Sequence, residues 1–245
     1  MALNKSLMSV ADALVRVLEG AAPLPPESAQ LNDAHGRVLA ADVVALRTQP
    51  PADLSAMDGY AVRAADVASV PVTLEIVGEV AAGHPFAGSV NKGQAARIFT
   101  GGVVPPGADT IVIQENTKRE GTSVSVTTSA PSGKHIRRAG LDFAHGQALL
   151  RRGRRLTERD LMLAAAMSHP TVAVHRRPRV AVLGTGDELK APGSKLAPGE
   201  IIYSNGFALL AMARAEGAEV IDLGVVADRL EDTVSAIRQI GRAHV

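Results

Sequence analysis

Two apolar runs in the C-terminal part of the sequence constrain its fold more than any other feature. Residues 179–184 and 219–224 are rich in β-branched residues, which is typical of strands buried in a parallel sheet. Between them lies a predicted helix that Ser204-Asn205 precede and cap, and a second helix is predicted over residues 231–240. The order strand, helix, strand, helix predicts a parallel sheet with right-handed crossover connections.

The N-terminal and middle parts of the sequence have different patterns. Apolar residues at helical spacing follow a capping box at Ser9, and Gly20 stands where such a helix ends. Between about residues 43 and 142 glycine and proline are frequent, which indicates a small all-β region. Its predicted strands are 72–77, 110–113 and 123–127, with a hairpin loop at 118–122, and a further helix is predicted from a Thr157 cap through residue 167.

The composition excludes several classes of function. Lys and Arg number 26 against 25 Asp and Glu, and the aromatic residues are 4 Phe and 2 Tyr, so we expect no nucleic-acid partner. Cysteine is absent, which excludes disulfides, thiolate catalysis and Cys-ligated metal sites. Neither a targeting segment nor an apolar run near the ~20 residues of a transmembrane helix is found, so we expect a cytoplasmic protein without a membrane partner.

Two glycine-containing segments of the middle region place polar side chains beside tight turns. Asp58 lies in an Asp-Gly bend just before a predicted strand. Thr100 follows another strand-like run and precedes Gly101-Gly102, where its hydroxyl and exposed backbone N–H groups can meet an oxyanion. The plainer interpretations are an Asp-Gly turn and a Gly/Pro loop between strands, which the local pattern alone favours.

A third segment opens the first C-terminal strand into a Gly-Thr-Gly loop, where parallel α/β sheets bind ligands. Gly184 and Gly186 match the first two glycines of a dinucleotide fingerprint, but Leu189 stands at the third position. Asp187 and Glu188 would oppose a bare pyrophosphate, so a phosphate there needs a cation such as Mg²⁺. The segment therefore favours an anionic ligand handled with a metal over a simple NAD site.

Taken in order, these segments closely resemble the MoeA family of molybdopterin molybdenumtransferases, which is related to the E domain of gephyrin. They read Ser-Ala-Met-Asp-Gly-Tyr-Ala from residue 55, Thr-Gly with Val-Pro-Pro-Gly-Ala-Asp from residue 100, and Gly-Thr-Gly-Asp-Glu-Leu from residue 184. Arg-Arg-Ala-Gly-Leu-Asp from residue 137 and Ile-Tyr-Ser-Asn from residue 202 add to the resemblance, although relatives often carry an acidic residue at Leu141. The resemblance runs from Ser9 to Ile240 and corresponds to the N-terminal three-fifths of a family member.

The resemblance implies a mixed α/β, multidomain fold. It implies an elongated linker domain with helical and extended chain (residues 1–44 plus 143–172), a β-rich lid domain (45–142) and an incomplete, parallel α/β molybdopterin-binding domain (173–245). Family members are homodimers in which the lid faces the pterin-binding domain of the partner subunit. Molybdopterin adenylyltransferase and other molybdenum-cofactor enzymes are further partners that the resemblance suggests.

The activity implied by the resemblance is insertion of molybdate into adenylylated molybdopterin, with Mg²⁺ as cofactor and AMP released. The catalytic residues it implies are Asp58, Asp142 and Glu188, and the metal ligands are Asp58, Glu188 and Asp228. The substrate-binding residues are Thr100, Gly184, Thr185, Gly186, Asp187, Ser204, Asn205 and Asp228. Two alternatives stay open, namely a non-catalytic scaffold that keeps the fold and a fragment without activity of its own.

Overall fold

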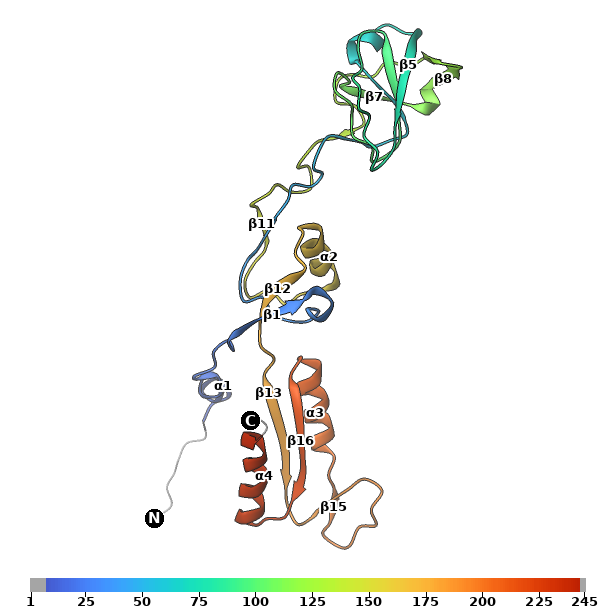
Figure 1. Ribbon diagram of the computed structural model, residues 1–245. Helices are drawn as coiled ribbons and strands as arrows, with labels where there is room; N and C mark the ends of the chain where they lie inside the picture. The colour runs from blue at the N-terminus through green and yellow to red at the C-terminus, as the bar shows by residue number, and fades with distance from the viewer. Residues whose placement is uncertain (1–7, 243–245) are drawn as a thin grey trace. The chain divides into compact units, whose positions relative to one another are not determined.

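The computed structural model describes residues 8–242, and the chain divides into two compact units (Figure 1). Unit 1 comprises Met1–Ala41, Arg152–Glu158 and Thr171–Val245, and unit 2 comprises Asp42–Arg151 and Arg159–Pro170. Residues 1–7 and 243–245, which the predicted linker and molybdopterin-binding domains include, lie outside the described residues. No helix within residues 8–242 is long and apolar enough to cross a membrane.

Unit 2 is built around a six-stranded sheet with the order β7-β4-β6-β5-β9-β8. Its strands are β4 (Gly59–Val62), β5 (Val72–Val80), β6 (Gln94–Ile98), β7 (Thr110–Ile113), β8 (Thr117–Glu120) and β9 (Ser123–Val126). Neighbours pair antiparallel except β5 and β6, which are parallel. The three predicted strands are confirmed, and β5 extends three residues further than predicted.

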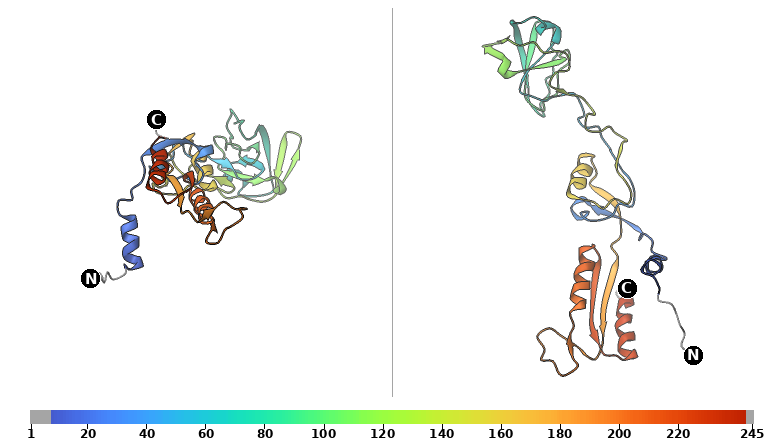
Figure 2. Two further views of the ribbon diagram at one scale, coloured as in Figure 1. Left: turned by 90° about the horizontal axis from the view of Figure 1, so that it is seen from below. Right: turned by 180° about the vertical axis from the view of Figure 1, so that it is seen from behind.

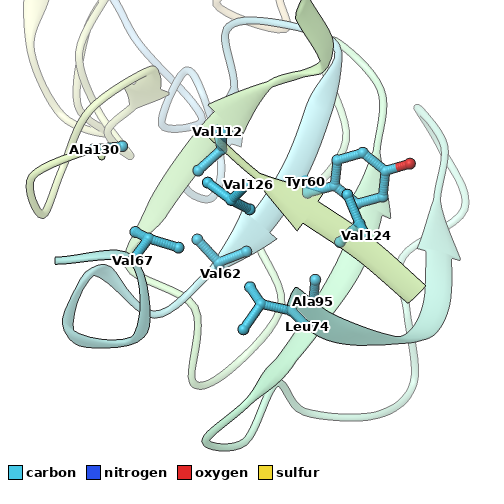
Figure 3. Close-up of a cluster of buried hydrophobic side chains, with 9 residues drawn as sticks. All are labelled: Tyr60, Val62, Val67, Leu74, Ala95, Val112, Val124, Val126 and Ala130. Atoms are coloured by element: carbon cyan, nitrogen blue, oxygen red, sulfur yellow. The ribbon is translucent and has the colours of Figure 1, made fainter. Parts of the chain in front are cut away.

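The core of unit 2 lies on both faces of this sheet because successive residues of a strand point to opposite faces. All four residues of β4 are buried. Tyr60 and Val62 contribute to one apolar cluster (Figure 3), and Ala61 to a second cluster with Ile98 and Ile111. Small and β-branched side chains fill both clusters, in keeping with the low aromatic content of the chain.

The predicted hairpin loop at 118–122 is wrong, because most of it is strand β8. Residues 117–120 pair with β9, and only Gly121 and Thr122 form the turn, with Gly121 at a φ of +61°. β8 is an edge strand with a run of charged residues, and such charges oppose pairing of the exposed sheet edge with a strand of another molecule. That polarity gives the segment the local appearance of a loop.

Short elements connect the sheet of unit 2 to the rest of the chain. Strand β2 (Val43–Val44) pairs with β11 (Ala148–Leu150), and β3 (Leu54–Ser55) pairs with β10 (Ile136–Arg137). The 3-10 helices η2 (Ala64–Val67) and η3 (Gln114–Asn116) flank the strands, and α2 (Glu158–Ala166) is the helix predicted after Thr157.

Unit 1 contains the strands and helices predicted from the C-terminal pattern. Strands β13 (Arg179–Thr185) and β16 (Glu219–Val226) are parallel, as predicted, and α3 (Asn205–Ala215) and α4 (Leu230–Arg242) flank them on opposite sides (Figures 1 and 2). The remaining elements are α1 (Val10–Leu18), η1 (Leu31–Asp33), β1 (Pro26–Gln30) antiparallel to β12 (Thr171–His175), and β14 (Leu189–Lys190) parallel to β15 (Ile201–Ile202).

Local details of unit 1 both confirm and correct the sequence predictions. At α1 the Ser9 Oγ accepts a hydrogen bond from the Asp12 backbone N–H, so the N-cap is confirmed, while the Asp12 carboxylate accepts from the Ser9 hydroxyl and not from the Ser9 backbone N–H as in a complete capping box. At α3 Ser204 holds the N-cap position without a side-chain capping bond, and Asn205 is already helical. Only Val182 and Gly184 of β13 are buried, so this strand is less covered than its apolar composition predicts.

Candidate functional site

Asp58 and Thr100, which are 42 residues apart in the sequence, are hydrogen-bonded in unit 2. The Thr100 backbone N–H and hydroxyl both donate to Asp58 Oδ1, at 2.8 and 2.7 Å. These two bonds, the backbone one first, and the positive charge of Arg97 hold the pKa of Asp58 below its ordinary value. Asp58 is therefore an ionised carboxylate at neutral pH, suited to binding a cation or orienting a donor.

Strand pairing explains why these two residues meet. Asp58 precedes β4 and Thr100 follows β6, and Gly59 pairs with Ile98 across the two strands. On its other side β4 lies close to β7, where a Cβ at Gly59 would lie 2.1 Å from the Val112 carbonyl oxygen. Gly101 has a φ of +82°, which lets the chain turn immediately after Thr100.

Asp142 is held by an ion pair within unit 2. Arg137 Nη2 lies 3.0 and 3.1 Å from its two carboxylate oxygens, and the Asp142 backbone N–H donates to Gln49 O. Asp53 nearby accepts from the Ala139 N–H and from Arg138, and these interactions lower the pKa of Asp53. The structure gives Asp142 a guanidinium partner and no contact with Asp58.

The acidic residues of unit 1 gather at the carboxyl edge of the parallel strand pair. Thr185 pairs with Val226, so the loops after β13 and β16 leave the sheet side by side. The Asp228 N–H donates to Asp187 Oδ1 at 3.3 Å, which joins the two loops. Gly186 has a φ of +150°, and the Glu188 carboxylate lies 2.5 Å from where its Cβ would be. Ligands of parallel α/β sheets bind at this edge.

A cavity of about 240 Å³ opens beside this edge. It is lined by Val182, Leu183, Gly184, Thr185, Leu189, Ile201, Ile202, Tyr203, Ser204, Asn205, Gly206 and Leu209. Four predicted substrate-binding residues are among them, namely Gly184, Thr185, Ser204 and Asn205. The N-terminal residues of α3 line it, so backbone N–H groups of a helix start lie at its wall.

Tyr203 is a cavity residue whose importance the sequence does not reveal. Its ring lies against Gly184 and Gly206, where a Cβ would lie 2.7 and 1.8 Å from ring and hydroxyl atoms. Its hydroxyl is buried and has no hydrogen-bond partner among residues 8–242. A buried hydroxyl without a partner is costly, and a ligand that reaches it recovers that cost. Glycine at both contacting positions is the signal that points to it.

The structure divides the predicted site residues between the two units. It brings Asp58 to Thr100 in unit 2, and it brings Asp187, Glu188 and Asp228 to one sheet edge in unit 1. The described part of the chain contains no group of three His, Cys, Asp or Glu side chains arranged to hold a metal ion.

This arrangement defines an α/β protein with a cavity at the carboxyl edge of two parallel strands and a β-rich unit that carries a second polar pair. The model of the "MoeA N-terminal region (domain I and II)" matches residues 8–168. The chain belongs to the MoeA family.

Relatives and solved structures agree with this membership. A molybdopterin molybdenumtransferase of Nostoc sp. is 43% identical over 209 residues, covering 82% of this chain and 48% of the relative. That of Staphylococcus epidermidis is 30% identical over 245 residues, covering 98% of this chain and 58% of the relative. The crystal structure of the molybdopterin biosynthesis MoeA protein from Pyrococcus horikoshii OT3 matches with a TM-score of 0.89 at 31% identity, covering 97% of this chain and 65% of that chain. The chain thus spans about half the length of the curated relatives it matches.

Proposed function

We propose that this protein acts in molybdenum-cofactor synthesis by inserting molybdate into adenylylated molybdopterin with release of AMP. The observation that carries the proposal is the cavity beside Asp187, Glu188 and Asp228 at the carboxyl edge of β13 and β16. Membership in the MoeA family and the names of its relatives support the substrate class. Apolar walls such as Leu183 and Leu209 suit a planar pterin.

The residues of the two units take different roles in this proposal. In unit 1 the cavity binds the pterin, and Asp187, Glu188 and Asp228 lie beside its phosphates. Mg²⁺, when bound by one or two of these carboxylates, would supply the positive charge that the phosphates need. In unit 2 the ionised Asp58, held by Thr100, orients a donor or a cation.

A homodimer is part of the proposal. The apolar residues of α1 are unburied, and Val10, Leu14 and Val17, at helical spacing, lie on one face. Covering such a face with the same face of a second copy removes apolar surface from water and stabilises the dimer. We expect Leu14→Glu to convert a dimer into a monomer in analytical ultracentrifugation. The matched control is Arg16→Glu, on the polar face of the same helix, which should keep the dimer.

In the proposed dimer Asp58 and Thr100 act together with Glu188 and Asp228 of the partner subunit. In a protein extended to the length of its relatives, mixing inactive Asp58→Asn and Glu188→Gln subunits should then restore part of the activity, because one of the two sites in a mixed dimer carries neither change. If verified subunit exchange restores no activity, each subunit builds its own site.

The central test separates substrate binding from turnover. The 245-residue chain should bind adenylylated molybdopterin but release little AMP, because it spans about half the length of its relatives. Extending it with the C-terminal half of the Nostoc relative should give AMP release that depends on Mg²⁺ and molybdate. If neither protein binds the substrate, the proposal is wrong. A dimer that binds no substrate favours the non-catalytic scaffold.

Two substitutions test the site residues in the extended protein. Asp58→Asn and Glu188→Gln should each lower AMP release by a factor of ~10²–10⁴, as the loss of an oriented carboxylate does. Glu120→Gln on the exposed hairpin and Glu219→Gln at the amino end of β16 are the matched controls, and both should retain the activity. Turnover near normal in Asp58→Asn and Glu188→Gln would contradict the assignment.

A further inference from the structure

We propose that an open pocket of unit 2 binds a tetrahedral oxyanion such as a phosphate group. The pocket has a volume of about 370 Å³ and is lined by Tyr60, Arg97, Gln114, Thr117 and Arg119; we call it the arginine pocket. None of these residues belongs to the predicted active site. The inference rests on unit 2 alone and does not depend on the proposed transferase activity.

Arg97 is a fixed cationic group in this pocket. Its guanidinium lies over the rings of Tyr60 and Phe99, 5.3 and 4.7 Å from their centroids. Its Nη1 donates to the Gly59 carbonyl oxygen at 3.2 Å, and its Nη2 donates to Gln114 Oε1 at 2.8 Å. Within residues 8–242 no carboxylate lies within ion-pair distance of Arg97, although its charge acts on the nearby Asp58 and lowers the pKa of that carboxyl group.

Arg119 brings a second cation to the same pocket. It is exposed on the edge strand β8, and its Nε donates to the Gly121 carbonyl oxygen at 3.1 Å. Its neighbour Lys118 forms an ion pair with Glu120 at 2.8 Å, whereas no ion pair of Arg119 is found in the described part of the chain. Two guanidiniums without carboxylate partners therefore line one pocket.

Tyr60 adds a hydroxyl that the fold leaves without a partner. The residue is 97% buried, since its exposed fraction is 3%, and its ring closes the edge of the apolar cluster. Figure 3 shows its oxygen pointing away from the cluster. No hydrogen bond of this hydroxyl is found among residues 8–242, although Tyr60 lines the pocket. Because this hydroxyl is not itself a buried atom, it is accessible to solvent and can donate to a ligand in the pocket.

These groups select the chemistry of the ligand. Guanidinium and phenol groups donate hydrogen bonds, and one arginine guanidinium can donate two parallel hydrogen bonds to two oxygens of a phosphate group. No carboxylate lines the pocket, and the Glu115 carboxylate next to it accepts a hydrogen bond from Gln114 Nε2 at 3.4 Å, so an anion meets two positive charges inside the pocket and one negative charge beside it. Charge-assisted hydrogen bonds of this kind are about twice as strong as neutral ones. A phosphate group and molybdate share this tetrahedral oxyanion chemistry.

The test titrates the full chain with inorganic phosphate, AMP or molybdate in about 0.1 M salt, which screens non-specific attraction. Binding is followed by NMR at the Arg97 and Arg119 side-chain Nε–H groups. We expect saturable shifts at both arginines. Arg119→Gln should weaken binding about tenfold, because it removes a charge-assisted hydrogen bond. Lys118→Gln, the control with the same charge change on the same strand, should weaken it far less. Tyr60→Phe should also weaken binding.

The three titrants distinguish the source of the oxyanion. Saturation by phosphate and AMP supports a phosphate ester as the ligand, and saturation by molybdate supports the metal oxyanion. Shifts that do not saturate with any titrant overturn the proposal. Equal weakening by Arg119→Gln and Lys118→Gln also overturns it, because the effect would then be general charge. AMP release is not measured, so failure here leaves the transferase proposal standing.

Discussion

Replacing Gly59 by alanine tests how the sheet of unit 2 supports Asp58. The new Cβ would lie 2.1 Å from the Val112 carbonyl oxygen, 2.9 Å from its carbon and 3.0 Å from the Ile113 Cα. All three are backbone atoms of β7, so no side-chain rotation relieves the contact. Strands β4 and β7 must separate by about 0.9 Å to bring the shortest contact to 3.0 Å.

The cost follows from what this separation disturbs. β4 pairs with β7 at four positions, and every residue of β4 is buried. Overpacking of a core costs about 1–3 kcal/mol, and each buried backbone hydrogen bond that opens costs about 1–3 kcal/mol more. We expect Gly59→Ala to destabilise unit 2 by about 3–5 kcal/mol. The Gln114 N–H to Asp58 carbonyl bond of 3.1 Å, which ties Asp58 to the end of β7, would also lengthen.

The tyrosine content of the chain makes the assay specific for unit 2. The protein has 2 Tyr and no Trp, and Tyr60 lies in unit 2 while Tyr203 lies in unit 1. In a Tyr203→Phe background, Tyr60 fluorescence during urea unfolding reports on unit 2 alone. With an m value near 2 kcal/mol/M, Gly59→Ala should lower the midpoint by roughly 2 M.

Gly121→Ala is the control for this substitution. Gly121 lies in the hairpin of the same sheet at a φ of +61°, and no atom lies within 4 Å of a Cβ there. The cost is then the backbone conformation alone, about 1–2 kcal/mol. If Gly59→Ala destabilises no more than Gly121→Ala, the close approach of β4 to β7 does not restrain this position and the reasoning is refuted.

Three further predictions address other parts of the chain. The pKa of Asp53 is lower in the folded protein than in the unfolded chain, so its contribution to stability is present above about pH 4 and is lost as the pH falls through the folded pKa. Asp53→Asn should therefore make the stability of unit 2 depend less on pH on the acid side. Amide hydrogens of residues 180–183 should exchange faster than those of 110–113, since β13 is half exposed and β7 mostly buried, and equal protection would contradict this. Tyr203→Phe should stabilise unit 1 by about 1 kcal/mol in thermal unfolding, and a loss of stability would mean that the hydroxyl has a partner.

Several features of this protein follow from short stretches of sequence. The N-cap at Ser9 specifies the start of α1, and the alternation of strand and helix after Pro178 specifies the parallel pair β13 and β16. The ordered motifs that contain Asp58 and Glu188 indicate the MoeA family, and the family match agrees. These features are determined locally, because caps, periodicity and glycine turns depend on neighbours a few residues away.

Other features depend on which distant segments pair. The register of β4 against β6 brings Thr100 to Asp58, and the pairing of β8 with β9 turns a predicted loop into a strand that carries Arg119. The parallel register of β13 and β16 likewise joins Asp187 to Asp228.

The same dependence hides buried polar groups from the sequence. The unpaired hydroxyl of Tyr203, and the cation–π contacts of Arg97 with Tyr60, follow from packing between segments rather than from any local pattern. The sequence by itself determined the elements and the family, whereas only the tertiary structure decided which side chains meet. The physical reason is that hydrogen bonds and charges act over a few ångströms in space, whatever the distance along the chain.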